Sequence, residues 1–344
     1  MDERARLRAL AAECGFELCG VAPAEPHPDA ARYLDWVSAG RAGEMAYLTD
    51  HRAQLRMDPR NLLPSARSLI CAGKLYNGPQ AYSNTFNDQE RGWISRYAWG
   101  QDYHDVVRSG LDDLVQRLQI DFGPFESRTC VDTAPLLERS YAAHAGLGWI
   151  GKNTCLINQA RGSWFFLGEL LVSREFPPDD SAPDRCGTCT RCIDACPTGA
   201  LIPDGGRYAL DARLCISYFT IELRGPVPEP MRKHVTHHVF GCDICQDVCP
   251  WNIGAPVTAE AQFQAVNDTP RLDRMAGLTE QEFREMFRGS PVKRARYEGF
   301  LRNVAVAMGN ARRPEFREPL QRLAAHPLKL VAEHARWALV QFDR

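Results

Sequence analysis

Eight of the thirteen cysteines in this chain stand at spacings typical of metal ligands, and this feature constrains the fold more than any other. In chain order they are Cys186, Cys189, Cys192, Cys196, Cys215, Cys242, Cys245 and Cys249. A C-x2-C step lets two thiolates turn toward one inorganic centre, whereas disulfides are rare in cytosolic proteins. The spacing therefore predicts metal ligation within one short segment.

The run from Cys186 to Pro197, C-x2-C-x2-C-x3-C-P, is the one used by bacterial two-cluster ferredoxins, in which the fourth cysteine serves the other cluster. We therefore predict two 4Fe-4S clusters. The first is expected to take Cys186, Cys189, Cys192 and Cys249, and the second Cys196, Cys215, Cys242 and Cys245. The alternative is a pair of structural zinc sites, which also use C-x2-C units but need neither the third step nor the C-x3-C-P endings.

The composition sets the frame for this segment. Of 344 residues, 44% are hydrophobic and 24% charged, which predicts an ordinary globular protein of two or three domains. No apolar run reaches the roughly 18 residues that a membrane span needs, so we expect a cytoplasmic protein without a targeting segment. The net charge of -2 neither indicates nor excludes a nucleic-acid partner. The other five cysteines are expected to be small buried hydrophobic residues: Cys14, Cys19, Cys71, Cys130 and Cys155.

Hydrophobic periodicity divides the chain into three predicted domains of an α+β protein. Residues 1–176 alternate helical and strand-like patterns and predict an α/β domain. The proline-rich, acidic stretch 177–184 opens a ferredoxin-like domain over residues 177–255. Residues 256–344 are expected to be helical, and their last three helices resemble one HEAT-type unit. The elements predicted in the first domain are helices 3–14, 29–38, 103–120 and 135–145 and strands 17–21, 68–74, 127–132 and 164–172.

The glycine-rich segment 146–153 matches a dinucleotide-binding loop and, in part, a phosphate-binding loop. Both interpretations are weak, because the glycines follow a predicted helix rather than a strand, and no Ser or Thr comes directly after Lys152. The segment instead predicts a turn at the C-terminus of a helix, with close backbone approach to something flat and large.

Three further groups of residues are candidates for a functional site. Asp132 ends a predicted strand just before Pro135, and the local pattern leaves helix capping and proton donation open. Aromatic residues gather in segment 93–104; such clusters are more often core, but Arg96, Gly100 and Gln101 leave a ligand-facing loop open. Basic residues gather in the 26 residues between Cys215 and Cys242, at Arg224, Arg232, Lys233, His234, His237 and His238, and again at Lys293, Arg294 and Arg296. The first of these groups is suited to an anionic substrate such as RNA.

Together the motifs resemble the epoxyqueuosine reductase family of queuosine biosynthesis. The matching pieces occur in order across roughly residues 15 to 255: Arg56-Met57-Asp58-Pro59-Arg60, segments 96–104, 132–139 and 146–154, the cysteine run, and segment 216–223. The resemblance implies cobalamin held between a nitroreductase-like α/β domain and the ferredoxin module, with a HEAT-like tail.

The resemblance also implies an activity, which is the reduction of epoxyqueuosine to queuosine at the wobble position of tRNA anticodons. The clusters would pass electrons from an external low-potential donor to cobalamin, whose reduced cobalt attacks the epoxide carbon while Asp132 acts as general acid. The cobalamin contacts that it implies are Arg56, Tyr97, Asp132, Asn153, Ser217, Cys242 and Asp243, with Arg224 at the RNA. We expect a monomer. The rival hypotheses are a reductive dehalogenase and a non-catalytic electron-transfer protein.

Overall fold

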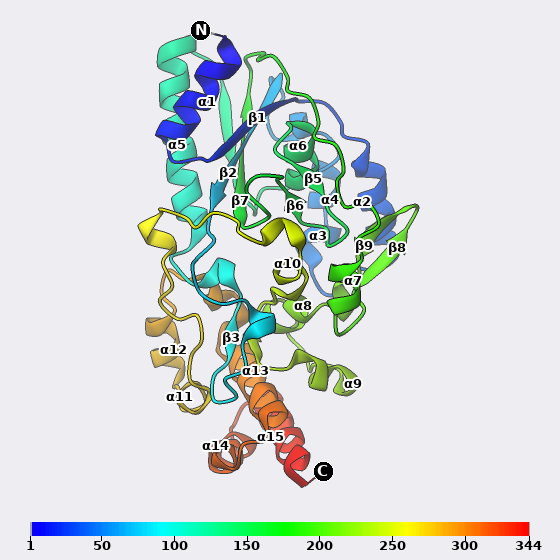
Figure 1. Cartoon of the computed structure of the whole chain (residues 1–344), viewed down its shortest axis with the longest axis vertical. Coiled ribbons are helices and arrows are strands. Elements are labelled where there is room, and N and C mark those ends of the chain that lie inside the picture. The colour runs from blue at the N-terminus through cyan, green and yellow to red at the C-terminus, as the bar shows by residue number, and fades with distance from the viewer. Residues whose placement is uncertain (1, 344) are drawn as a thin grey trace.

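The computed structural model describes residues 2–343, and a four-stranded antiparallel sheet organises its N-terminal half (Figure 1). The strands lie in the order β1-β2-β7-β4, with bounds β1 Leu18–Pro23, β2 Ser68–Leu75, β7 Phe165–Val172 and β4 Ser127–Cys130. Glu169 on β7 stands opposite Cys71 on β2 and Cys130 on β4. Because side chains alternate along a strand, these three residues share one face of the sheet.

Helices cover both faces of this sheet. α1 (Glu3–Glu13) and α5 (Tyr103–Phe122) lie on one face, where their leucines pack with Ile70 and Leu170. α6 (Glu138–His144) lies on the other face, where Tyr141 packs with Cys71 and Cys130. The shorter α2 (Asp29–Ser38), α3 (Ala46–Thr49) and α4 (Arg52–Leu55) connect β1 to β2. The result is a three-layer arrangement around two apolar interfaces.

The cysteine segment is built from short elements in the middle of the molecule (Figure 1). Its helices are α7 (Arg191–Ala195), α8 (Ile216–Ile221), α9 (Glu229–Arg232) and α10 (Ile244–Asp247). Three two-stranded pairs lie in or beside it: β3 (Trp93–Ile94) with β10 (His238–Phe240), β5 (Trp149–Ile150) with β6 (Leu156–Ile157), and β8 (Leu201–Asp204) with β9 (Arg207–Leu210). The β3–β10 pair is parallel and joins the aromatic segment to the cysteine segment.

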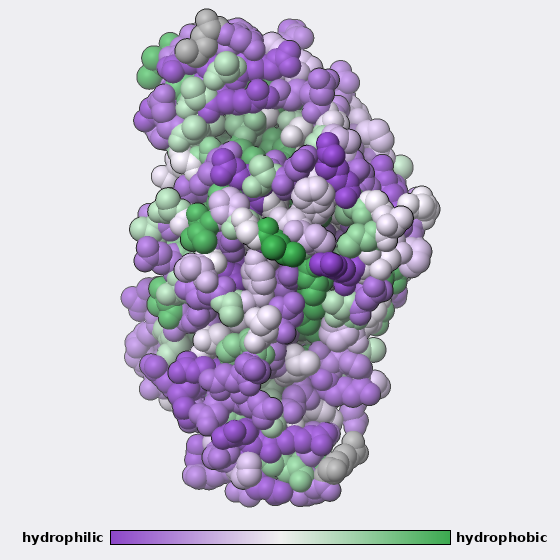
Figure 2. All heavy atoms as spheres, in the orientation of Figure 1, coloured by the Kyte–Doolittle hydropathy of each residue, from purple (hydrophilic) through white to green (hydrophobic). Residues whose placement is uncertain are grey.

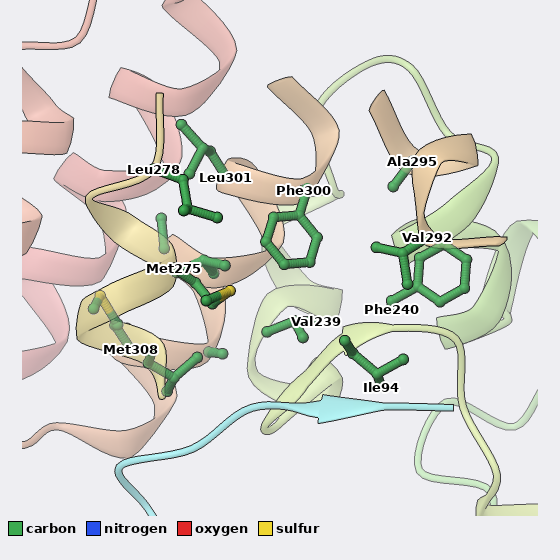
Figure 3. Packing of buried hydrophobic residues seen from close by; sticks show 14 of the residues in the cluster. Ile94, Val239, Phe240, Met275, Leu278, Val292, Ala295, Phe300, Leu301 and Met308 are labelled. Carbon is green, nitrogen blue, oxygen red and sulfur yellow. The ribbon is translucent and has the colours of Figure 1, made fainter. Parts of the chain in front are cut away.

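The C-terminal helices share one core with these earlier segments. They are α11 (Leu272–Ala276), α12 (Glu280–Met286), α13 (Arg296–Ala311), α14 (Arg317–Ala324) and α15 (Lys329–Val340). Figure 3 shows Phe300 of α13 near Val239 and Phe240, and Leu301 beside Leu278. The apolar cores therefore cross the predicted limits 1–176, 177–255 and 256–344, and this division of the chain stays a prediction.

Most of the predicted helices and strands are confirmed, and the differences have local causes. The predicted strand 127–132 ends at Cys130, because Asp132 adopts a φ of 47° in the left-handed region. The predicted helix 135–145 begins only at Glu138. None of the described helices is long and apolar enough to cross a membrane.

Candidate cluster and proton-donor site

The structure brings the predicted ligands of the first cluster together. Burial, followed by the neighbouring thiols of Cys249, Cys186 and Cys189, raises the pKa of Cys192 to about 11. Lys152 supports this group by donating hydrogen bonds from Nζ to the carbonyl oxygens of Gly187 (2.8 Å) and Cys189 (2.9 Å). The lysine that resembled a phosphate-binding residue thus holds the backbone around the predicted first cluster.

The predicted ligands of the second cluster also lie together. Burial, with the neighbouring thiols of Cys215 and Cys196, raises the pKa of Cys242 well above its usual range. Cys245 contacts Cys155, and a hydrogen bond between these thiols is the main cause that raises the pKa of Cys245. Cys155 is only half-buried, so the expectation of a small buried hydrophobic residue is wrong for it.

Two other scattered cysteines also differ from expectation. Cys14 and Cys19 are only half-buried, and the Cys14 thiol lies 3.4 Å from an Asp113 oxygen. Cys71 and Cys130 are fully buried as predicted. Within residues 2–343 no three Cys, His, Asp or Glu side chains are placed as ligands of a single metal ion.

Backbone N–H groups point at the sulfurs of the second group. The Cys196 sulfur accepts from the Ala200 N–H at 3.4 Å. Burial raises the pKa of Cys215, and the N–H groups of Tyr218 and Ser217 at the start of α8 oppose that rise. Hydrogen bonds to sulfur stabilise negative charge and tune the potential of a cluster held by such thiolates.

The glycine-rich segment 146–153 adopts the predicted turn. Gly146 follows α6 with a φ of 76°, and its N–H bonds to the carbonyl of Ala143 at 3.1 Å. Strand β5 follows, rather than the helix that a dinucleotide-binding loop requires. The turn delivers Asn153, whose side chain donates to the Cys245 carbonyl (3.3 Å), so the segment faces the second group of cysteines.

Asp132 lies on the loop between β4 and α6 and does not cap the helix. The N-cap residue of α6 is Leu137, and no side chain bonds to the first turn. The Asp132 side chain is 52% exposed, although protein atoms surround it closely enough for desolvation to act on its carboxylate. The carboxylate is therefore open to solvent on one side and enclosed by protein on the other, and we call this half-enclosed space the Asp132 hollow.

His104 binds Asp132 directly. Its Nε2 lies 3.1 Å from Asp132 Oδ2, and its Nδ1 lies 2.7 Å from Asp102 Oδ1. Asp102 caps α5 through the His104 N–H and also accepts from Lys293 Nζ at 2.7 Å. Desolvation lowers the pKa of His104, but the hydrogen bonds to Asp102 and Asp132 outweigh it and raise the pKa to about 9. The imidazole is therefore cationic at neutral pH.

Other polar groups converge on the same carboxylate. Desolvation acts to raise the pKa of Asp132, but His104, then Arg294 and Tyr103, lower it below its ordinary value. Burial raises the pKa of Tyr97, whose charged neighbours are Asp132, Glu222, Arg294 and Asp243. Tyr97 thus faces both the Asp132 loop and the segment that carries Cys242.

The other predicted cofactor residues differ in how far protein contacts already engage them. Arg56 is buried and donates to the Tyr47 carbonyl at 3.1 Å. Asp243 is 1% exposed, and its carboxylate accepts from Trp93 Nε1 (2.9 Å) and the Arg96 N–H (2.8 Å). With its carboxylate committed to protein donors, Asp243 could contact a cofactor only through its backbone. Ser217 is half-buried in the first turn of α8.

The aromatic segment is mainly core. Trp93 and Trp99 are each 2% exposed, and the Arg96 guanidinium lies over the Trp99 ring at 4.4 Å from its centroid. Tyr97 and Tyr103 are the half-buried members that border the hollow. The ligand-facing interpretation therefore fits only these two aromatic residues.

The fold does not keep apart the two basic groups that the sequence suggests. Arg224 donates to the Arg294 carbonyl at 2.9 Å and has Arg296 as a charged neighbour, so it joins the second group. Arg232 and His238 are buried, and burial lowers the pKa of His238 to about 4. The predicted basic surface within residues 216–241 was therefore wrong for these two residues.

Apolar residues gather across the middle of one otherwise polar face, where α10 and the segment after it run (Figure 2). Among the exposed apolar side chains, Ile253 (69%) and Val257 (52%) follow Cys249 in the chain. Two hollows that neither Asp132 nor these apolar residues line are found over α11 and α12 and beside Lys74, Asp105 and Glu260.

Comparison with known proteins assigns the cysteine segment. A family described as "4Fe-4S double cluster binding domain" matches residues 185–252, and one described as "Epoxyqueuosine reductase QueG, DUF1730" matches residues 56–133. The epoxyqueuosine reductase of Xanthomonas campestris pv. campestris is 43% identical over 99% of this chain and 96% of its own length. The chain belongs to the epoxyqueuosine reductase family. It is an oxidoreductase with a double-cluster domain, which sets aside both the zinc and the pure electron-carrier hypotheses.

Other members of the epoxyqueuosine reductase family agree. The enzyme of Pseudomonas aeruginosa is 42% identical over 95% of this chain and 91% of its own. A solved epoxyqueuosine reductase bound to a tRNA-Tyr epoxyqueuosine-modified tRNA stem loop superposes with a TM-score of 0.89 at 28% identity, covering 99% of this chain and 90% of that chain. A Bacillus subtilis enzyme whose catalytic aspartate loop is swung out of the active site superposes at 0.88, also at 28% identity, covering 98% and 90%.

Several residues of this site had no predicted role. His104, Asp102 and Lys293 form one chain of contacts, although Lys293 is 191 residues from Asp102. The Asp-x-His spacing at the start of helix 103–120 was a usable signal for the first two, because an N-cap aspartate reaches the residue two positions on. Lys293 was singled out only as a member of a basic group, and no sequence pattern linked it to Asp102.

Proposed function

We propose that this protein reduces epoxyqueuosine to queuosine in the anticodon of tRNA. The observation that carries the proposal is Asp132, held by His104 in an open hollow that also borders the cysteine segment through Tyr97. Removal of the epoxide oxygen as water leaves an alkene and consumes two electrons and two protons. The chain offers a cysteine-rich segment for the clusters that would carry the electrons, and Asp132 for the delivery of a proton.

The electrons would pass through two 4Fe-4S clusters. The proximity of Cys192 to Cys186, Cys189 and Cys249 supports the first ligand set. For the second, the ligands are Cys196, Cys215, Cys242 and Cys245. An external low-potential donor would supply the electrons, and it could approach either ligand set, because a Cβ added at Gly187 or at Gly199 would meet nothing within 4 Å.

The residues around Asp132 also fit cobalamin. Tyr97 would give an aromatic wall, while Asn153, Ser217 and the Cys242-Asp243 backbone would contact the cofactor from the cysteine side. Both ring nitrogens of His104 are already engaged, so this histidine is not free to ligate cobalt. Bound there, cobalamin would supply a strongly reducing, nucleophilic cobalt centre.

Arg56 supports this space indirectly by fixing the Tyr47 backbone. The ring of Tyr47 lies under the Arg294 guanidinium, 5.1 Å from the ring centroid. Arg224 would contact RNA phosphate at the rim, beside Arg294. We propose that the enzyme acts on tRNA in the cytoplasm and that it is a monomer. Its tail would be HEAT-like and its sheet domain nitroreductase-like.

The role of Asp132 is to deliver a proton to the epoxide oxygen as the carbon–oxygen bond opens. Replacing it in Asp132→Asn keeps the size and removes the acid, so turnover should fall by about 10²–10⁴ while tRNA binding stays unchanged. The measurement is mass spectrometry of tRNA nucleosides after incubation with the reduced, cobalamin-loaded protein. Asp112→Asn, at a partly exposed carboxylate that bonds Thr129, is the matched control. Near-normal queuosine formation by Asp132→Asn would overturn the assignment.

A further inference from the structure

Asp132 alone is a poor source of the proton that the proposed reaction needs. The ion pair with His104 holds the carboxylate in its charged form at neutral pH, and a carboxylate cannot donate a proton. The group that does carry a proton is the imidazole, whose Nε2 lies 3.1 Å from Asp132 Oδ2. The aspartate and the histidine therefore hold one transferable proton between them.

We propose that His104 reloads Asp132 with the proton used in the reaction, and that Asp102, anchored by Lys293, keeps the imidazole cationic for this purpose. The inference rests on the proposed function of Asp132. In the transfer, the Nε2–H bond of His104 breaks and an O–H bond forms on Asp132 Oδ2. Neutral His104 keeps its Nδ1–H bonded to Asp102, and solvent restores the lost proton through the 30% of its side chain that is exposed.

The surroundings of His104 keep a proton on its imidazole until the epoxide oxygen draws one away through Asp132. The charged groups that act on it most are Asp102 and Asp132, both anionic, and the Glu138 carboxyl, which is protonated at neutral pH, also faces it. Tyr103 stacks on its ring at 4.2 Å between centroids and in turn stacks on Phe166 at 4.2 Å, which fixes the plane of the imidazole. Asp102 is 7% exposed, so its charge acts through protein rather than through water.

The geometry also explains why Asp102 serves better than a more distant carboxylate. It is the N-cap of α5 and accepts from the backbone of His104, so the imidazole and its partner belong to one rigid turn. Lys293 Nζ at 2.7 Å occupies its second oxygen. Asp102 is therefore held in place independently of the mobile proton. His104 is a positioning residue in this scheme, because it acts on substrate only through Asp132.

The first test measures the imidazole itself, in the full-length protein without cobalamin. Histidine-selective nitrogen-15 NMR over a pH series, assigned with His104→Gln, should give a midpoint near 9 for His104. Asp102→Asn should lower this midpoint by about 1–3. A midpoint near the ordinary value of about 6.5, unmoved in Asp102→Asn, would overturn the proposal even if the enzyme is active.

The second test follows single turnovers of the reduced, cobalamin-loaded enzyme on an epoxyqueuosine-containing stem loop. His104→Gln should be at least about tenfold slower at pH 7, and the alkaline fall of its rate should move to lower pH. Asp102→Asn should also move the alkaline fall of the rate to lower pH. His51→Gln, at a histidine with an 81% exposed side chain, is the control and should leave the profile unchanged.

The experiments distinguish failure of the proposed function from failure of the reloading role of His104. If His104 titrates high but the unaltered enzyme never forms queuosine, the proposed function fails while the His104–Asp102 couple stands. If the enzyme is active and His104→Gln keeps both rate and pH profile, the reloading role is overturned and the proposed function stands.

Discussion

Glu169 lies in the middle of β7 with none of its side chain exposed, and neither carboxyl oxygen has a hydrogen-bond partner of normal geometry within residues 2–343. Burial raises its pKa well above the usual range, and the nearby Glu138 carboxyl raises it further. Glu138 itself has its pKa raised to about 8, by burial and then by Asp132. At neutral pH these two glutamates are therefore protonated while Asp132 is not.

This pair makes stability depend on pH. Because the folded pKa lies above the unfolded one, the folded chain keeps protons that the unfolded chain releases, so stability falls as pH rises from about 4.3 toward the folded values. Glu169→Gln is neutral at every pH. We expect equal melting temperatures for variant and parent at low pH, and a variant more stable by roughly 1–3 kcal/mol above pH 8.

The comparison needs an exposed carboxylate as control, and Glu175, whose side chain is 77% exposed and paired with Arg67, provides it. Glu175→Gln should track the parent over the whole pH series. If the stability of Glu169→Gln and that of the parent fell in parallel as the pH rises, Glu169 would already be ionised in the folded chain.

The glycine-rich turn after α6 brings two segments of the chain into close contact. Gly146 has a φ of 76°, and a Cβ there would stand 2.6 Å from the Asp180 carbonyl, so the turn and the segment that leads to the first cysteines touch backbone to backbone. Gly289 has a similar φ of 69°, with nothing within 4 Å of its Cβ position.

Alanine substitutions at the two glycines distinguish the cost of backbone strain from the cost of pushing two segments apart. Gly289→Ala should cost about 1–2 kcal/mol of unfolding free energy, the cost of placing a side chain in left-handed backbone. Gly146→Ala should cost roughly 1–3 kcal/mol more, because the segments must also move apart. Urea denaturation followed by circular dichroism measures both, and equal losses would mean that the Asp180 segment yields freely.

Helices and strands were predictable where the hydrophobic pattern persists over many residues and a capping residue marks an end. Helix 29–38 has its predicted bounds, and α5 begins where the Asp102 cap sets it. The strands β3, β5 and β6 have two residues each and leave no periodic trace. The predicted cysteine groups follow from spacing alone, whereas the link between Lys293 and Asp102 depends on tertiary packing that no local pattern encodes.

At the scale of the whole molecule, the C-terminal helices complete the core beneath the site. Trp93, Ile94 and Phe240 pack with Phe300 and Val292, so the segments that carry Tyr97 and Cys242 rest on the tail (Figure 3). The sequence showed three compositional regions but not this sharing, because contacts between distant segments have no sequence period. One result of the shared core is that Lys293 and Arg294, just before α13, reach Asp102 and the Asp132 hollow.

The same packing gathers Arg224, Arg294 and Arg296 beside that hollow, and this predicts how tRNA binding responds to salt. If Arg224 neutralises one phosphate, Arg224→Gln should weaken binding and reduce the slope of log affinity against log salt by about 0.7–0.9, because one fewer counterion set is released. Fluorescence anisotropy of a labelled anticodon stem loop at several salt concentrations measures this slope. Arg67→Gln removes a 66% exposed arginine side chain from the sheet domain and should leave the slope unchanged. Equal slopes for Arg224→Gln and the parent would place the RNA away from this rim.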